Sequence, residues 1–336
     1  METQQLRYKN SHRARMERVI SGEAADRVPV ALWRHFPVDD QTPENLAAAT
    51  LDFQKSYDFD FVKVTPASSY CLKDWGIKDE WTGAVEGTRD YVSRVIHTPE
   101  DWLTLPVLDP YSGKLAAQII CLKRITSELG ASVPVIQTIF NPLSQAKNLV
   151  GKEKLLYHMR SNPQALAAGL RTIAESTQLF MDAARDTGIA GFFYAVQHAQ
   201  YHLLSLEEYH EFGRIYDLEL LTSVDDMWLN ILHLHGNNIM FKAVMDYPVS
   251  VINWHDRDTA PTLKDGLVDF RGVVCGGLRR EQSMVLGSPT EVTAEALDAI
   301  NSTGGKRFIL GTGCVVPITA PRANLIAARQ SVELTR

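Results

Sequence analysis

Short apolar runs recur along the chain and alternate with segments of helical periodicity. Near-continuous apolar runs are typical of strands that are buried on both faces of a sheet. The helical pattern is clear at 162–188 and at 288–304, and the second of these opens with Ser288-Pro289 and ends in glycine, as capped helices do. The pattern predicts eight strands, at 28–35, 60–66, 133–140, 191–196, 230–235, 250–255, 272–278 and 307–313.

Eight strands that alternate with helices predict an α/β protein with a (β/α)8 TIM-barrel fold, formed as a single domain over 1–336. Residues 1–27 are polar and helical, and we expect them to form an N-terminal helical extension. Residues 67–132 form a long insertion between the second and third strands, which we expect to decorate the barrel mouth. A doubly wound sheet is the alternative, but it would need a glycine-rich phosphate turn where the chain has R-H-F-P-V-D-D.

Composition and charge narrow the function classes. The chain is 45% hydrophobic and 22% charged with a net charge of −6, and the absence of a Lys/Arg run argues against a nucleic-acid surface. No apolar stretch approaches the ~20 residues that span a bilayer, and the start lacks the apolar core of a signal peptide. We therefore expect a cytoplasmic protein with reduced thiols at Cys71, Cys121, Cys275 and Cys314.

Histidines gather at the predicted carboxyl ends of the strands, where TIM barrels carry their active sites. Histidines scattered through a core would not be expected to gather at these strand ends. The histidines at these ends are His35, His198, His202, His233, His235 and His255, and the same ends carry Trp33, Arg34, Asn141, Gln197 and Cys314.

Three of these residues suggest a metal site. His233 and His235, in N-I-L-H-L-H-G-N-N, share one face of a strand because side chains alternate with period two. Cys314 follows the last strand in G-T-G-C. Two imidazoles and a thiolate with an open fourth position form a catalytic zinc pattern. The alternative is that the histidines are structural and that Cys314 is a small buried hydrophobe; the joint occurrence at the predicted catalytic face favours the metal.

Two of the remaining residues keep alternative roles at this stage. Arg34 and His35 could bind an anionic group, or they could pair with Asp39 or Asp40. Cys275 lies inside a predicted strand, where packing is its expected role.

Five stretches carry a family resemblance: D-R-V-P-V-A-L-W-R, L-H-L-H-G-N, V-C-G-G-L, S-P-T-E-V and G-T-G-C-V-V-P-I-T-A-P-R-A-N-L. With them the chain resembles the uroporphyrinogen decarboxylase superfamily over nearly its whole length, which implies a TIM barrel. The decarboxylases' own features are missing. V-K-V-T-P-A-S-S lacks the acid expected after the second strand, R-H-F-P-V keeps only Arg34 of the basic pattern, and T-I-F-N-P lacks the expected tyrosine.

The chain is more similar to the zinc-dependent corrinoid methyltransferases of the methylcobalamin:coenzyme M type. That branch carries H-x-C-G-N and G-C-x-x-P, whose three residues bind zinc, and the matching positions are His233, His235 and Cys314. His235 stands where that branch usually has cysteine, which makes the site harder and less suited to a thiol acceptor. Cobalamin-independent methionine synthases carry an acid where this chain has His255, so His255 would be a fourth ligand or a base that contacts the substrate.

The resemblance implies methyl transfer between a corrinoid, carried by a separate partner protein, and a small methyl donor or acceptor. The implied reaction includes demethylation of an O-, N- or S-methyl compound. The two imidazoles and one thiolate favour oxygen and nitrogen substrates. His255, His198 and Arg34 are the candidate catalytic residues. Trp33, His35, Asn141, Gln197 and His202 are the candidate substrate contacts.

Two other functions stay open at this stage. One is a metal-independent decarboxylase or lyase that uses Arg34, His35 and His198 on a small carboxylate. The other is a catalytically silent binding protein. The oligomeric state also stays open, although many relatives form homodimers.

Overall fold

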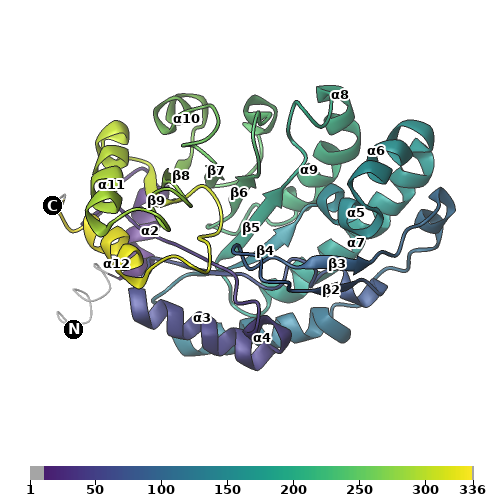
Figure 1. The fold of residues 1–336 in the computed structure, drawn as a ribbon, viewed down its shortest axis with the longest axis horizontal. Coiled ribbons are helices and arrows are strands. Elements are labelled where there is room, and N and C mark those ends of the chain that lie inside the picture. Colours follow the sequence, from purple (N-terminus) through teal and green to yellow (C-terminus); the bar gives the residue numbers. More distant parts are fainter. Residues whose placement is uncertain (1–10, 335–336) are drawn as a thin grey trace.

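A curled parallel sheet forms the centre of the molecule, and helices form an outer layer around it (Figure 1). The computed structural model describes residues 11–334. The strand order β1-β4-β5-β6-β7-β8-β9 follows the chain, as repeated βα units require. The strands are β1 (Val62–Val64), β4 (Val135–Phe140), β5 (Gly191–Val196), β6 (Ile231–Leu234), β7 (Val251–Trp254), β8 (Val273–Leu278) and β9 (Phe308–Thr312), and every residue in them is buried.

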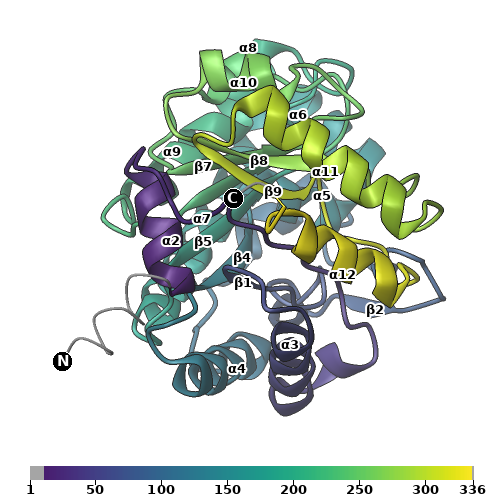
Figure 2. The same ribbon diagram turned by 90° about the vertical axis from the view of Figure 1, so that its left-hand side faces the viewer.

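Helices follow the strands on the outer side, and a view turned by 90° shows the strands between α3 and α4 on one side and α8 and α10 on the other (Figure 2). The α-helices are α2 (His12–Ile20), α3 (Pro43–Tyr57), α4 (Gly113–Leu129), α5 (Pro142–Val150), α6 (Lys152–Ser161), α7 (Pro163–Arg185), α8 (Leu206–Tyr209), α9 (Ile215–Thr222), α10 (Leu263–Asp269), α11 (Pro289–Thr303) and α12 (Arg322–Ser331). Short turns of 3-10 helix lie at η1 (Asp39–Gln41), η2 (Lys73–Trp75), η3 (Pro99–Thr104) and η5 (Phe241–Val244), and a π-turn lies at η4 (His210–Arg214). Within residues 11–334, no helix has the length and apolarity needed to cross a membrane.

The two helices predicted most clearly are confirmed. The segment 162–188 corresponds to α7, and 288–304 corresponds to α11. Ser288 caps α11 by accepting a hydrogen bond from the backbone N–H of Glu291, and Gly304 ends it with φ 63°. The local signals were sufficient here because caps involve only neighbouring residues.

The predicted first strand, 28–35, is the exception. Only Val30 forms a bridge, with Leu310 of β9. The backbone N–H of Leu310 donates to the carbonyl of Pro29 at 2.8 Å, and the carbonyl of Val30 accepts from the N–H of Asp60 at 2.9 Å. Pro29 has no N–H to donate, and the N–H of Val30 donates to the Asp60 carboxylate at 2.7 Å. The segment therefore lies extended between β9 and the start of β1. Seven of the eight predicted strands are confirmed, and closure into a full (β/α)8 barrel stays a prediction.

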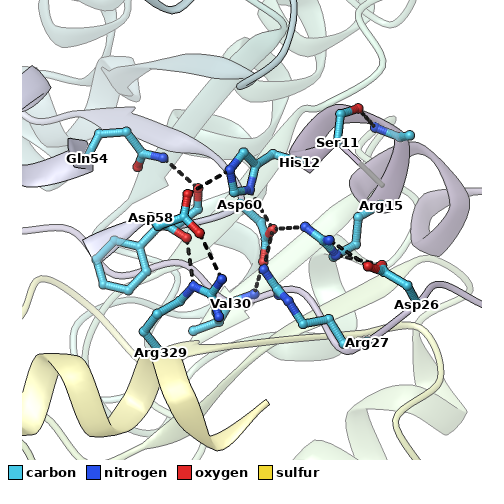
Figure 3. A network of polar contacts seen from close by, with 12 residues as sticks. Ser11, His12, Arg15, Asp26, Arg27, Val30, Gln54, Asp58, Asp60 and Arg329 are labelled. Carbon is cyan, nitrogen blue, oxygen red and sulfur yellow. Dashed lines mark hydrogen bonds and ion pairs between the residues drawn. The ribbon is translucent and has the colours of Figure 1, made fainter. Parts of the chain in front are cut away.

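Asp60 is the centre of a polar network at the amino ends of the strands (Figure 3). Its fully buried carboxylate lies 2.6 Å from Arg15 Nη1, 2.6 Å from Arg27 Nη1 and 2.9 Å from His12 Nδ1. Burial alone would raise the pKa of Asp60, but His12 and the two guanidinium groups hold it well below its usual range. The network holds α2 against the sheet. Of the predicted extension 1–27, residues 1–10 lie outside the described part of the chain.

The predicted insertion 67–132 contains an antiparallel hairpin, β2 (Lys78–Glu80) and β3 (Asp90–Ser93), before α4. The loop of the hairpin reaches the segment that follows β9, because the N–H of Ile318 donates to the carbonyl of Val85 at 2.8 Å. Gly87 in the same loop has room for no side chain, since a Cβ there would lie 2.6 Å from the Cβ of His35. The loop thus covers the carboxyl-end residues near His35.

Candidate metal centre

Four side chains converge at the carboxyl ends of three strands. His233 belongs to β6, His235 and His255 directly follow β6 and β7, and Cys314 follows β9. Their ligand atoms all lie within 4.8 Å of one another. The structure thus brings together the three predicted ligands and His255, which the sequence offered as a fourth ligand or a base.

The backbone explains why these residues meet. His233 pairs in register with Asn253, so the residues that follow β6 and β7 emerge side by side. β9 is not a neighbour of β6, and Cys314 reaches the site through the turn at Gly313. A Cβ at Gly313 would lie 2.7 Å from the Cα of His255 and 2.8 Å from the carbonyl oxygen of Trp254. Glycine therefore allows the close approach that delivers the thiol.

Asn253 sets the orientation of His233. Its Nδ2 donates to the carbonyl oxygens of Cys275 at 2.9 Å and Thr312 at 3.0 Å, so its Oδ1 is the atom that faces His233. That oxygen lies 2.7 Å from Nδ1 of His233. Because an amide oxygen only accepts, Nδ1 carries the proton and Nε2 keeps its lone pair.

Unpartnered atoms point to a ligand at the centre of the cluster. The Nε2 atoms of His233 and His255 are buried and have no hydrogen-bond partner. Sγ of Cys314 lies 3.8 Å from Nδ1 of His235. Burial acts to raise the pKa of the Cys314 thiol, but the three imidazoles hold it well below its usual range. Native structures rarely leave buried polar atoms unpaired without a ligand or another functional reason.

The donor set fits zinc. Three imidazole nitrogens and one thiolate are the atoms that tetrahedral Zn²⁺ takes, at about 2.0–2.3 Å from the metal. The free Nε2 of His233 and the thiolate character of Cys314 both favour the deprotonated ligands that a metal requires. His255 could complete the set or leave its position to a substrate, since catalytic zinc sites keep one exchangeable position.

Further predicted residues border the cluster. His35 and His198 are buried, and burial lowers the pKa of His35 to about 4 and that of His198 to about 3. Both imidazoles are therefore neutral at pH 7. The buried atoms without partners in this region include Nε1 of Trp33, Nδ1 of His35, Oε1 of Gln197 and Nδ1 of His198. Such atoms are available to a polar substrate.

Three other predicted residues are engaged or placed elsewhere. Arg34 packs its guanidinium over the rings of Phe36 and Phe53 and donates to the carbonyl of Ile318 at 3.3 Å. Asn141 caps α5 by accepting from the N–H of Ser144, and its Nδ2 donates to the buried carboxylate of Asp217. His202 is exposed on the turn after β5. Roles in the reaction for these three stay predictions.

The structure partly answers whether Arg34 and His35 pair with Asp39 or Asp40. Asp40 pairs with Arg89 from the insertion, at 2.9 Å, and not with either residue. Asp39 contributes to the pKa of Arg34 only through its charge at a distance.

Sequence reasoning missed Asn253 and Lys63. Lys63 lies in the middle of β1, and its side chain is buried. A lysine between valines in a strand with no exposed face was the available signal, because lysine is almost never buried without a reason. Asn253 had a weaker signal of the same kind, a lone amide inside V-I-N-W.

Comparison with known proteins gives a consistent result. The uroporphyrinogen decarboxylase (URO-D) family model matches residues 11–333. Methylcobamide:CoM methyltransferase MtbA of Methanosarcina mazei is 22% identical over 238 residues, which cover 69% of this chain and 68% of that protein. The protein of the same name from Methanosarcina acetivorans is 21% identical over 252 residues, which cover 74% and 72%.

Solved structures share the fold. A methyltransferase from Methanosarcina mazei matches with a TM-score of 0.85 at 17% identity, over 97% of this chain and 99% of that one. A B12-independent methionine synthase from Shewanella sp. W3-18-1, in complex with selenomethionine, matches with a TM-score of 0.60 at 11% identity, over 92% and 93%. The resemblance expected from the sequence is confirmed, and the curated relatives carry the name of methyltransferases. Because the family model spans nearly all of the described residues, the chain belongs to the uroporphyrinogen decarboxylase family.

Proposed function

We propose that this protein is a zinc-dependent methyltransferase that moves a methyl group between a corrinoid protein and a small-molecule donor or acceptor. The observation that carries the proposal is the cluster of His233, His235, His255 and Cys314, with two buried Nε2 atoms that no protein group satisfies. The names of the curated relatives support the reaction class.

His233, His235 and Cys314 would hold the zinc, with His255 as fourth ligand or as a base beside the substrate. The ion would supply Lewis-acid polarisation of the heteroatom that gains or loses the methyl group. A set of three nitrogens and one sulfur is harder than a set with two thiolates, so it favours oxygen and nitrogen substrates over thiols. Demethylation of an O- or N-methyl compound is therefore the preferred direction.

The residues around the cluster have roles that follow from their protonation. His198 and His35 are neutral at pH 7, since burial lowers the pKa of each, and each keeps a ring nitrogen without a partner. A neutral imidazole can accept or donate one hydrogen bond to a small substrate without attracting a counter-ion. Trp33 and Gln197 offer one further donor and one further acceptor. These four residues would orient the methyl compound.

A metal-independent decarboxylase is the less favoured function. It would need Arg34 to face the substrate carboxylate, and the Arg34 guanidinium instead covers Phe36 and Phe53. It also leaves the convergence of three imidazoles on Cys314 without a purpose.

Metal analysis tests the proposal directly. We expect about one zinc per chain in the purified protein, and loss of that zinc in His233→Ala and Cys314→Ala variants. Cys121→Ala is the matched control, because Cys121 is a buried cysteine on α4 that is not part of the cluster. Methyl transfer from methylated substrates to cob(I)alamin, followed by the absorbance of methylcobalamin, tests the reaction. A protein that takes up no zinc would refute the proposal.

A further inference from the structure

Lys63 lies on the inner face of the curled sheet, on the same side as the metal cluster. Its ammonium nitrogen lies 4.5 Å from the centre of the Phe193 ring on β5. The Phe193 ring also stacks on the imidazole of His233, with centroids 5.2 Å apart. A continuous line of side chains therefore joins Lys63 on β1 to a metal-cluster histidine on β6.

Lys63 has no acidic partner among residues 11–334. Its ammonium group donates to the hydroxyl of Thr65 at 3.2 Å, and the rings of Phe193 and Trp33 flank it. Burial lowers the pKa of Lys63 to about 7, and the charge that counteracts this effect is that of Cys314. A buried charge is costly unless it is paired, and a methionine would fill the same volume without that cost.

Two further cations act on residues in or beside the metal cluster. Lys147 on α5 lies close enough to His198 to influence its charge and has no ion pair among the described residues. Arg280 is paired with Glu86 from the insertion, so this acid is already neutralised. A bound metal ion would add further positive charge. Lysines without an acidic partner in this region favour an anion over a cation beside the cluster.

Trp33 supplies a second donor beside the lysine. Its side chain is buried, its indole N–H has no hydrogen-bond partner, and its ring lies 5.9 Å from the Lys63 nitrogen. An ammonium group and an indole N–H together match the two oxygens of a carboxylate.

We propose that Lys63, with the indole N–H of Trp33, binds a carboxylate of the methyl-bearing small molecule, so that the enzyme selects anionic methyl compounds. This inference rests on the proposed methyl transfer, because it names the substrate class of the same site. The carboxylate end lies over Phe193, and the methyl-bearing heteroatom is directed toward His233 and Cys314.

Binding of matched acid and amide probes tests the inference. Methoxyacetate and its neutral counterpart 2-methoxyacetamide are titrated into the zinc-loaded protein by calorimetry. We expect the wild-type protein to bind the acid at least about tenfold more tightly than the amide, and Lys63→Met to lose that preference, since a tenfold change corresponds to about 1.4 kcal/mol. Lys55→Met is the matched control, because Lys55 is exposed on α3.

Two results would overturn the inference. One is equal affinity of the wild-type protein for acid and amide, including no binding of either. The other is a Lys63→Met variant that is folded by circular dichroism and still prefers the acid. In kinetics, the inference expects Lys63→Met to raise KM for an anionic substrate more than it lowers kcat.

Failure of this inference is distinguishable from failure of the proposed function. If zinc is bound and methyl transfer to cob(I)alamin occurs, but Lys63→Met leaves the acid preference unchanged, the role of Lys63 is wrong and the proposed methyl transfer stands. If Lys63 governs acid binding but the protein takes up no zinc and transfers no methyl group, the methyltransferase proposal is wrong and a carboxylate-binding site remains.

Discussion

Nδ1 of His233 lies 2.7 Å from Oδ1 of Asn253, so an amide on β7 holds the imidazole of β6 in the tautomer that a metal needs. The amide is itself held by the carbonyl oxygens of Cys275 and Thr312, on β8 and β9. Four neighbouring strands therefore cooperate to present one nitrogen lone pair.

Asn253→Ala is expected to weaken zinc binding about 10- to 100-fold, because His233 would lose the partner that fixes its tautomer and its ring orientation. Competition with a chromophoric chelator measures the affinity. Asn230→Ala is the control, because Asn230 is a buried amide at the start of β6 that bonds to Phe192 and Val224. Equal zinc affinity in the wild-type and Asn253→Ala proteins would contradict the role given to Asn253.

Gly313→Ala is expected to lower zinc affinity by more than about tenfold. A Cβ there would lie 2.7 Å from the Cα of His255, so the turn must move and carry Cys314 away from the histidines. The readout is zinc content after dialysis against a weak chelator. Gly304→Ala is the comparison, because Gly304 has φ 63° with open space around it. This substitution should lower the free energy of unfolding by about 1–2 kcal/mol and leave the zinc affinity unchanged. Full zinc retention in Gly313→Ala would disprove this account.

His235→Cys is expected to keep zinc while shifting the substrate preference. A second thiolate makes the metal softer and more electron-rich, which favours a thiol acceptor over an oxygen or nitrogen substrate. We expect the ratio of thiol methylation to O-demethylation to rise by about tenfold, or ~1.4 kcal/mol in relative barrier. His97→Cys, at an exposed position outside the cluster and the candidate substrate contacts, should leave the ratio unchanged. An unchanged ratio in zinc-loaded His235→Cys would remove the link between His235 and substrate choice.

Stability is expected to fall in acid through Asp60. Its pKa in the folded protein is held well below the usual value, whereas an unfolded aspartate titrates near pH ~4. The stabilisation from Asp60 is therefore fully present above about pH 5 and is lost as the pH falls toward the folded-state pKa. Urea unfolding at a series of pH values measures the loss. Asp60→Asn should be less stable by about 3–5 kcal/mol at pH 7, with a flatter dependence on acid.

Asp58→Asn is the control for that series. Asp58 pairs with Arg329 and His12 in the same network, but its side chain is 61% exposed. Exposed pairs contribute about 0–1 kcal/mol, so its loss should be small at every pH. If the acid dependence of Asp60→Asn equalled that of the wild-type protein, another carboxylate would govern acid unfolding.

The fold was predictable where burial leaves a local signature. Seven of the eight predicted strands form, because a strand that is buried on both faces must be apolar at nearly every position. The segment 28–35 has the same apolar pattern and fails as a strand. The N–H of Val30 donates to the Asp60 carboxylate and not to a backbone carbonyl, and no pattern within 28–35 carries that information.

The candidate site shows the same division between features that local sequence predicts and features that the tertiary structure determines. The sequence by itself determined the donor types and placed His233 and His235 on one face, since the period of a strand is a local property. The resemblance implied that Cys314 and His255 belong to the same site, but only the tertiary structure shows that all four ligand atoms lie within 4.8 Å of one another. It also decided that Arg34 turns toward Phe36 and Phe53 and that Lys63 lies against Phe193. The physical reason is that the curl of the sheet and the turn at Gly313 determine which distant ligand atoms come within reach of one ion.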